Sequence, residues 1–261
     1  MLDLRQIESF YPESLRIFGR NLLREYLQYK ILEIVYDSKY GNKLSFMGGT
    51  AIHMIHFNTR FSEDLDFDNL GLNRVEFESL GQLIKDKLEL QGCPLETRAV
   101  IKKAFRLYLR ISELLFRNNL SKDPREKIHL QVDMEPQRFE YNTDKILFNK
   151  FDVFGRISVV PVDILLAQKI HCIFKRKRPM GRDFYDALFL MGKTKPNLNY
   201  LKQKLQIESF PKLKFRLVRR CKALNFRQLA KDVEPFLFEP ADSKKVLFFE
   251  QYIKDYFPNY P

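Results

Sequence analysis

The sequence contains no tryptophan, only three cysteines and no long apolar run. The cysteines lie far apart, without the close spacing of a zinc site or the even number of a disulfide framework. A membrane-spanning helix needs about 18 consecutive apolar residues, and no segment approaches that length. The first residues include early acids and no apolar core, unlike a signal peptide. These absences predict a cytoplasmic protein with reduced thiols and no membrane partner.

Glycine and proline are also sparse, at 10 and 12 of 261 residues, while hydrophobic residues make up 45%. This composition is typical of a folded chain, long enough for one large domain or two modest ones. Lysine and arginine exceed the acidic residues by 12. Such an excess favours an anionic partner, with nucleic acid as the leading candidate. Charge alone is equally compatible with a soluble basic protein.

A glycine pair at Gly48 and Gly49 follows an apolar run and precedes a short amphipathic segment, residues 50–56. Leu44 and Phe46 alternate as in a strand, so the pair is predicted to form a strand-to-helix turn. Glycine lets the backbone approach a phosphate closely, and the free amides at a helix start favour anions. A turn without a binding role would need the same residues.

Two carboxylates, Asp64 and Asp66, follow 14 and 16 residues after Thr50. In a strand they share one face, roughly 7 Å apart, while Leu65 and Phe67 enter a core. Such a pair can hold two divalent ions about 3.5–4 Å apart, as in phosphoryl and nucleotidyl transfer. An Asp-x-Asp pair is more commonly just a solvated strand face. The pair together with the preceding glycine pair is less frequent by chance.

Nucleotidyl transfer of this kind needs a third acid on a neighbouring strand. Residues 127–135 alternate apolar and polar side chains as a clear strand, and Asp133 lies on its polar face. Glu135 shares that face and is the second choice. A solvent-facing edge strand would show the same alternation. The residue types leave open whether Asp133 binds metal or accepts a proton.

Further elements follow from periodicity and from turn residues. A long helix is expected over residues 13–38, and another over 73–90. The strand at 105–111 is expected to pair with a short one at 99–101. The economical fold is an α/β (α+β) domain with a sheet of four or five strands and helices on one side. Residues 1–160 would form this domain, and residues 161–261 a helical domain with helices at 162–175, 183–191, 197–207, 211–224, 225–236 and 242–256.

The helix predicted at 162–175 contains Lys169 among apolar residues. An interior lysine either extends its amine to solvent or pairs with a phosphate or an acid. Asp183 and Asp186 begin the next helix, and from spacing alone they are ordinary first-turn acids. The cationic loop between the helices, residues 175–182, could steer an RNA backbone. His53 and His56 lack acids or cysteines at matching spacing and are expected to be core or surface residues.

The runs GGT, at residues 48–50, and RFSEDLDF, at residues 60–67, resemble the nucleotidyltransferase signature of the DNA polymerase β superfamily. More narrowly, with LLAQKIHCIFKRKRPMGRDFYDALF at residues 165–189, they resemble the AbiEii-type toxin nucleotidyltransferases. The resemblance implies a polymerase β-like domain with a small mixed sheet, followed by a helical domain that completes a nucleotide cleft. It also implies a nucleoside triphosphate as substrate, with Mg²⁺ or Mn²⁺.

The resemblance assigns roles to individual residues. Asp64, Asp66 and Asp133 would be the metal ligands and catalytic acids. Lys169 would hold the triphosphate, and Asp183 would position Lys169 or the nucleotide sugar, with Asp186 as a weaker helper. The other expected nucleotide-binding residues are Gly48, Gly49, Thr50, Arg60 and Ser62. Arg60 would either contact a phosphate or neutralise the carboxylate cluster.

The resulting hypothesis is a toxin that transfers a nucleotide to an acceptor hydroxyl and releases pyrophosphate. Positive charge and the resemblance favour RNA as the acceptor, with the 3′ end of a tRNA as a candidate. A cognate antitoxin would act beside it and need not bind it directly. The alternatives are a nucleotidyltransferase that modifies a protein or small molecule, a nucleotide- or RNA-binding module without catalysis, and a basic structural protein with an accidental motif.

Overall fold

The computed structural model describes residues 1–257, and the chain divides into two compact units. The first unit comprises Met1–His56 and Phe61–Val160, and the second comprises Phe57–Arg60 and the chain from Pro161 onwards. The chain therefore passes between the units at residues 56–57, 60–61 and 160–161. The short segment Phe57–Arg60 joins the second unit through long-range contacts, which no local pattern in the sequence indicated.

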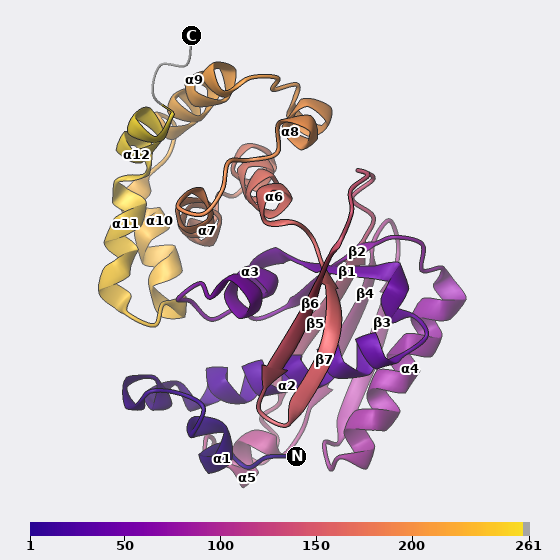
Figure 1. Cartoon of the computed structure of the whole chain (residues 1–261). Coiled ribbons are helices and arrows are strands. Elements are labelled where there is room, and N and C mark those ends of the chain that lie inside the picture. Colours follow the sequence, from indigo (N-terminus) through magenta and orange to yellow (C-terminus); the bar gives the residue numbers. More distant parts are fainter. Residues whose placement is uncertain (258–261) are drawn as a thin grey trace. The chain divides into compact units, whose positions relative to one another are not determined.

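A seven-stranded mixed sheet forms the centre of the first unit, in the order β3-β4-β5-β2-β1-β7-β6 (Figure 1). The β1–β7 and β2–β5 pairs are parallel, and the remaining neighbours are antiparallel. The strands are β1 (Leu44–Met47), β2 (Leu65–Asn69), β3 (Leu95–Ile101), β4 (Phe105–Ile111), β5 (Ile128–Glu135), β6 (Asp144–Lys150) and β7 (Val153–Val159). The expectation of four or five strands was wrong, because the sheet also contains the β6–β7 hairpin.

Two long helices, α2 (Gly19–Asp37) and α4 (Arg74–Leu90), cover the apolar face of this sheet. The ring of Tyr36 on α2 lies 6.3 Å from that of Phe67 on β2. The ring of Phe77 on α4 lies 5.1 Å from that of Phe105 on β4. Since strand side chains alternate between faces, this packing leaves Asp66 and its neighbours on the opposite face.

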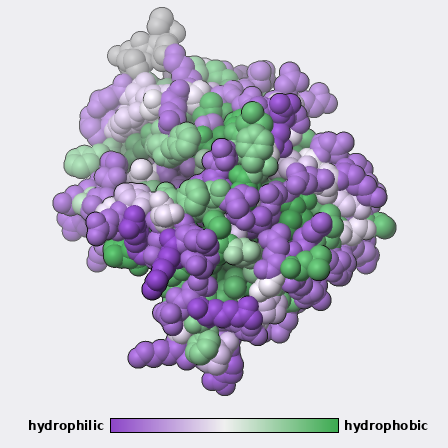
Figure 2. Space-filling model, turned by 60° about the horizontal axis from the view of Figure 1, so that its bottom comes forward, coloured by the Kyte–Doolittle hydropathy of each residue, from purple (hydrophilic) through white to green (hydrophobic). Residues whose placement is uncertain are grey.

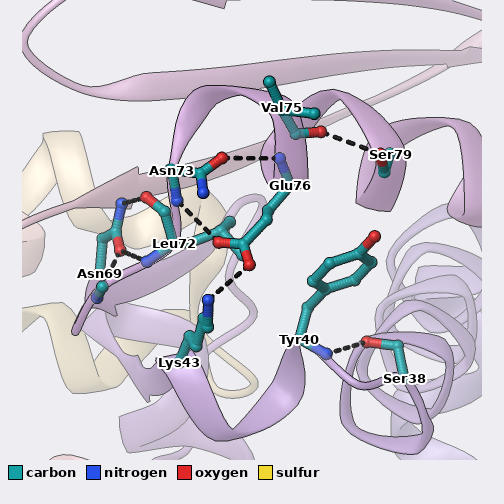
Figure 3. Close-up of polar contacts among 10 residues, drawn as sticks. Ser38, Tyr40, Lys43, Asn69, Leu72, Asn73, Val75, Glu76 and Ser79 are labelled. Carbon is teal, nitrogen blue, oxygen red and sulfur yellow. Dashed lines mark hydrogen bonds and ion pairs between the residues drawn. The ribbon is translucent and has the colours of Figure 1, made fainter.

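The start of α4 is fixed by a capping box, which the sequence spells out locally. The Asn73 side chain accepts a hydrogen bond from the Glu76 amide, and the Glu76 carboxylate accepts one from the Asn73 amide (Figure 3). Lys43, which immediately precedes β1, also donates to the Glu76 carboxylate. This contact ties the N-terminus of α4 to the start of β1.

The remaining helical elements of the first unit are short. The helix expected over residues 13–38 is divided, because residues 13–18 form a 3₁₀ helix ahead of α2. The elements are α1 (Leu4–Glu8), η1 (Glu13–Phe18), η2 (Gly41–Lys43), α3 (Gly48–His56) and α5 (Leu114–Arg117). The strand-to-helix turn predicted at the glycine pair is confirmed, since α3 follows β1 directly.

The second unit is helical. Its elements are α6 (Val162–Lys175), α7 (Gly181–Met191), α8 (Leu198–Leu205), α9 (Phe210–Cys221), α10 (Phe226–Val233), η3 (Glu234–Phe236), η4 (Pro240–Ser243), α11 (Lys244–Leu247) and α12 (Phe249–Tyr256). The helix expected over residues 242–256 is interrupted at Phe248. None of the helices in residues 1–257 has the length and apolar character needed to cross a bilayer. Figure 2 shows separate apolar patches among hydrophilic side chains on the face that it presents.

Candidate active site

The strand register of the first unit brings the predicted carboxylates together. Asp66 on β2 lies opposite Met47 of β1 on one side and opposite Asp133 of β5 on the other. Asp64 comes one residue before β2 and has the same parity as Asp66. All three aspartates are only partly exposed. The polar face of the sheet therefore presents a row of two paired carboxylates with a third beside it.

Gly48 is required at the turn for two independent reasons. Its φ of +79° lies in the left-handed region, which disfavours any residue with a Cβ. A Cβ at this position would also lie 2.1 Å from Asp66 Oδ2 and 2.8 Å from Asp66 Cβ. The turn and the Asp66 carboxylate therefore fit against each other, so the glycine pair and the acid strand form one structural feature.

Thr50, expected to contact a phosphate, is fully buried. Its hydroxyl donates a hydrogen bond to the backbone carbonyl of Asp64. A contact to phosphate would require this bond to break, and in the structure Thr50 instead fixes the chain just before β2. Ser62 is held through its backbone carbonyl, which accepts a hydrogen bond from Gln28 Nε2 at 3.1 Å.

Asp133 has two partners on the polar face. Gln131 Nε2 donates to both carboxylate oxygens, at 2.9 and 2.8 Å, and Arg106 Nε lies 3.5 Å from Asp133 Oδ1. Burial raises the pKa of Asp133, and these two partners only partly oppose that effect. Asp133 is therefore easier to protonate than an exposed aspartate.

The three aspartates suit a divalent cation in donor type and in register, because Mg²⁺ prefers carboxylate oxygens. As the side chains are placed, no three His, Cys, Asp or Glu residues among residues 1–257 converge closely enough to hold a metal ion. Gln131 and Arg106 contact the Asp133 carboxylate, so a metal ion bound by Asp133 would compete with these two partners.

A further aspartate on β2, Asp68, continues the alternation of Asp64 and Asp66. It is buried and accepts hydrogen bonds from the Gln137 amide and the Tyr141 hydroxyl, both at 2.7 Å. Asp68 therefore holds the segment that follows β5, a structural role distinct from that of Asp66.

His53 is buried beside a carboxylate that sequence spacing could not reveal. Its Nε2 lies 2.9 Å from Glu25 of α2, and Lys150 of β6 lies 2.7 Å from the same carboxylate. Burial alone would raise the pKa of Glu25, but His53 and Lys150 outweigh it and lower the pKa to about 2. This cluster ties α2, α3 and β6 together inside the first unit.

In the second unit, Asp186 is the centre of a buried ion-pair network. Its carboxylate accepts two hydrogen bonds from Arg60, both of 2.6 Å, and one of 2.8 Å from Asn58 Nδ2. Lys169 Nζ on α6 lies 2.8 Å from Asp186 Oδ2. Burial would raise the pKa of Asp186, but Arg60 and Lys169 lower it to about 2. Asp186, which was expected to be only a weaker helper, therefore contacts three side chains: Asn58, Arg60 and Lys169.

Lys169 also lies 3.3 Å from Asp183, which in turn is 2.8 Å from Arg176 Nε. Burial alone would lower the pKa of Lys169, but Asp186 and Asp183 more than offset this and raise it. The amine is therefore charged. Three cations, Arg60 included, face these two carboxylates.

The start of α7 is fixed by a close approach of two backbones. A Cβ on Gly181 would lie 2.0 Å from the Leu229 carbonyl oxygen of α10. The Gly181 amide donates a 2.7 Å hydrogen bond to Asp232 of the same helix. Only glycine allows this packing, and it fixes the turn of α7 that carries Asp183.

The predicted site residues thus form two clusters, one in each unit. Those of the first unit are Gly48, Gly49, Thr50, Ser62, Asp64, Asp66 and Asp133, and those of the second are Arg60, Lys169 and Asp183. Arg60 neutralises a carboxylate, but the partner is Asp186 of the second unit. Asn58, Gln131 and Arg106 contact these clusters although their positions in the sequence did not predict a role for them. Only the strand alternation, which sets Arg106 and Gln131 on the polar face, could have indicated any of them.

The sequence matches the family model described as "Nucleotidyl transferase AbiEii toxin, Type IV TA system" over residues 30–247. Among solved structures, it is similar to JHP933 from Helicobacter pylori, with 17% identity, a TM-score of 0.58 and 91% of each chain covered. A second Helicobacter pylori structure, described as a nucleotidyltransferase, has 17% identity and a TM-score of 0.56, covering 90% of this chain and 95% of that one. At these identities the likeness shows a shared fold. A search of curated proteins gives no match.

Proposed function

Because the chain belongs to the AbiEii nucleotidyl transferase toxin family, we propose that it transfers a nucleotide from a nucleoside triphosphate to an RNA hydroxyl, with release of pyrophosphate. The observation that carries this proposal is the position of the Asp66 side chain. Its carboxylate fits against Gly48 at a helix start and lies in register with Asp133 on the neighbouring strand. The backbone amides of this turn, which we propose to bind phosphate, therefore lie beside the paired acids of the central strands.

In this proposal Asp64, Asp66 and Asp133 are the residues that hold Mg²⁺ or Mn²⁺. The ions would neutralise charge on the triphosphate and lower the pKa of the attacking hydroxyl. Asp133 is also suited to take the proton of that hydroxyl on a carboxylate oxygen, because half-burial raises its pKa. Gly48 and Gly49 supply backbone amides for phosphate oxygens, and Thr50 fixes the position of Asp64.

Lys169 and the cations beside it are proposed to bind the triphosphate. Lys169 remains charged between Asp183 and Asp186, and a charged lysine amine can bind a phosphate group. Asp183 holds Lys169 and could accept a hydrogen bond from the ribose. Replacement of Lys169 by alanine alone is expected to destabilise the second unit, because it removes a cation from two buried carboxylates.

RNA is proposed as the acceptor class because the chain carries a net charge of +12. The 3′ end of a tRNA is one acceptor of this class. The family description places such proteins in Type IV toxin–antitoxin systems. We therefore propose a cytoplasmic toxin whose antitoxin partner does not need to bind it directly.

The proposal is tested by incubating the purified protein with each labelled nucleoside triphosphate and total RNA, with and without Mg²⁺. We expect label on RNA and free pyrophosphate only when the metal is present. Asp66→Asn should abolish both products while the protein remains folded. The matched control is Glu135→Gln on β5, which removes an exposed carboxylate outside the aligned row.

Two outcomes would redirect the proposal. Pyrophosphate release with label on a protein or small molecule would keep the activity and reject RNA as the acceptor. Nucleotide binding without pyrophosphate, across RNA, protein and small-molecule acceptors, would identify a binding module without catalysis.

A further inference from the structure

The polar face of the sheet continues beyond Asp133 into a cavity of about 250 Å³, which shares only Asp64 with the residues proposed to bind the metal and the triphosphate. The cavity lies wholly within the first unit. Side chains from three neighbouring strands line it: Arg98 of β3, Tyr108 and Arg110 of β4, and His129 and Gln131 of β5, together with Asp64. It therefore begins at a predicted metal ligand and extends across β5, β4 and β3.

Strand register explains why these side chains meet. Arg98 pairs with Tyr108, and Tyr108 pairs with Gln131, in one row across the three strands. One further step in the β2–β5 register sets Asp64 beside Gln131 in the same row. Arg110 and His129 form the adjacent row on the same face. The cavity is thus built on paired backbone, which holds its lining in fixed positions.

The lining has the chemistry of a nucleic-acid site. Arg98 and Arg110 are exposed, and within residues 1–257 neither guanidinium lies within ion-pair distance of a carboxylate. Glu96, which lies opposite Arg110, is paired with Lys127 at 2.6 Å. The two arginines are diagonal neighbours, about 7–8 Å apart, so they can contact phosphates of one strand. The flat ring of Tyr108 is half-buried beside them and can stack on a base.

The sheet order separates this cavity from the anion-binding turn. Gly48 follows β1 on one side of β2, whereas β5, β4 and β3 lie on the other side. A triphosphate at the Gly48 turn would leave the Asp133 side open for the attacking hydroxyl. We infer that the cavity binds the 3′-terminal nucleotide of the single-stranded RNA acceptor and directs its hydroxyl towards Asp133. This inference rests on the proposed nucleotidyl transfer.

The first test measures binding of a short, fluorescently labelled single-stranded RNA to the full chain by anisotropy, without triphosphate. Arg98→Ala/Arg110→Ala should weaken binding roughly tenfold and lower the slope of log K against log salt by about 1.4, as expected for two lost phosphate contacts. The control is Arg74→Ala/Arg125→Ala, which removes the same charge from exposed positions paired to Glu78 and Asp123. A purely non-specific effect of charge would weaken both variants equally and would overturn the inference.

The second test separates stacking from charge. Tyr108→Ala should weaken RNA binding about tenfold, whereas Tyr108→Phe should retain it, because the ring supplies the stacking surface. An RNA ending in 3′-terminal 4-thiouridine should crosslink to peptides of β4 and β5. Crosslinks confined to other segments would contradict the assignment.

These readouts distinguish failure of the inference from failure of the proposed function. If the wild type transfers a nucleotide to RNA and the arginine double variant keeps wild-type RNA affinity, the cavity is not the acceptor site although the function stands. If the double variant loses triphosphate affinity instead, the cavity holds the incoming nucleotide and the inference is wrong. If RNA binds in the cavity but no triphosphate reacts, the proposed function fails while the assignment of the RNA site is supported.

Discussion

Gly48→Ala is the most direct test of the link between the glycine turn and the acid strand. Gly48 and Gly92 both have left-handed φ angles, +79° and +81°. A Cβ on Gly92 would meet no atom within 4 Å, whereas one on Gly48 would lie 2.8 Å from Asp66 Cβ. Both glycines belong to the first unit, so Gly92→Ala reports backbone strain alone.

The expected magnitudes follow from this difference. Either substitution places a Cβ in the left-handed region, at a cost of about 1–2 kcal/mol. Gly48→Ala adds overpacking of about 1–3 kcal/mol. The added Cβ would clash with Asp66 Cβ as well as with the Asp66 carboxylate. A change of the Asp66 rotamer moves the carboxylate but not the Cβ, so it cannot relieve the clash fully. The strand must shift, and a displacement of about 1 Å at a catalytic group can reduce the rate about 100-fold.

The free energies of unfolding of the two variants, measured in urea, should therefore differ by about 1–3 kcal/mol, with Gly48→Ala the less stable. Metal-dependent pyrophosphate release should be close to wild type in Gly92→Ala and about 100-fold lower in Gly48→Ala. Equal stability of the two variants, together with wild-type activity in Gly48→Ala, would refute the fit between Gly48 and Asp66.

Three further outcomes are expected. Asp133→Asn should reduce the rate of nucleotide transfer by about 10²–10⁴-fold with little change in triphosphate affinity. Glu135→Gln on the same strand face should leave the rate unchanged. An equal effect of both substitutions in a single-turnover assay would reject a catalytic role for Asp133. Asp186→Asn should destabilise the second unit by about 3–5 kcal/mol, because it leaves two buried cations without their shared carboxylate; a loss below about 1 kcal/mol in urea unfolding would contradict this. Glu25 has a pKa near 2 in the fold against 4.5 as the reference, so its stabilisation is complete above pH 4.5 and is lost as the pH falls towards 2. The loss amounts to roughly 3 kcal/mol and should be absent in Glu25→Gln when unfolding is measured across that range.

Local pattern predicted the part of the fold that carries the proposed chemistry. The alternation around Asp66 and Asp133 identified β2 and β5, and the glycine pair identified the start of α3. The strand β6 was not expected because it is mostly exposed, with Phe148 as its one buried residue. An edge strand with polar residues on both faces lacks the period-two signal that revealed the central strands. The strand β7 does alternate, with Val153, Ile157 and Val159 buried, so the sequence contained a signal for this strand.

Contacts between residues far apart in the sequence could not be predicted from motif spacing. Arg60 and Asn58 meet Asp186 across 126 and 128 residues. Glu25 and Lys150 meet across 125 residues. No periodicity in a single sequence encodes such pairs, and spacing alone could not indicate that Asp186 contacts Asn58, Arg60 and Lys169. The close approach at Gly181 was missed for the same reason, because its partner lies on another helix.

The repeated passage of the chain between its two units has a consequence for how the protein can be divided. A cut after Val160 would remove Arg60 from Asp186 and take Thr59 away from its hydrogen bond with Phe238. The N-terminal fragment would carry an arginine whose buried partner is missing, and the C-terminal fragment would keep the buried Asp186 carboxylate without its two hydrogen bonds from Arg60. The helical unit therefore cannot be exchanged between relatives as an independent module. Any recombination that preserves both units has to transfer Phe57–Arg60 together with the helices that receive it.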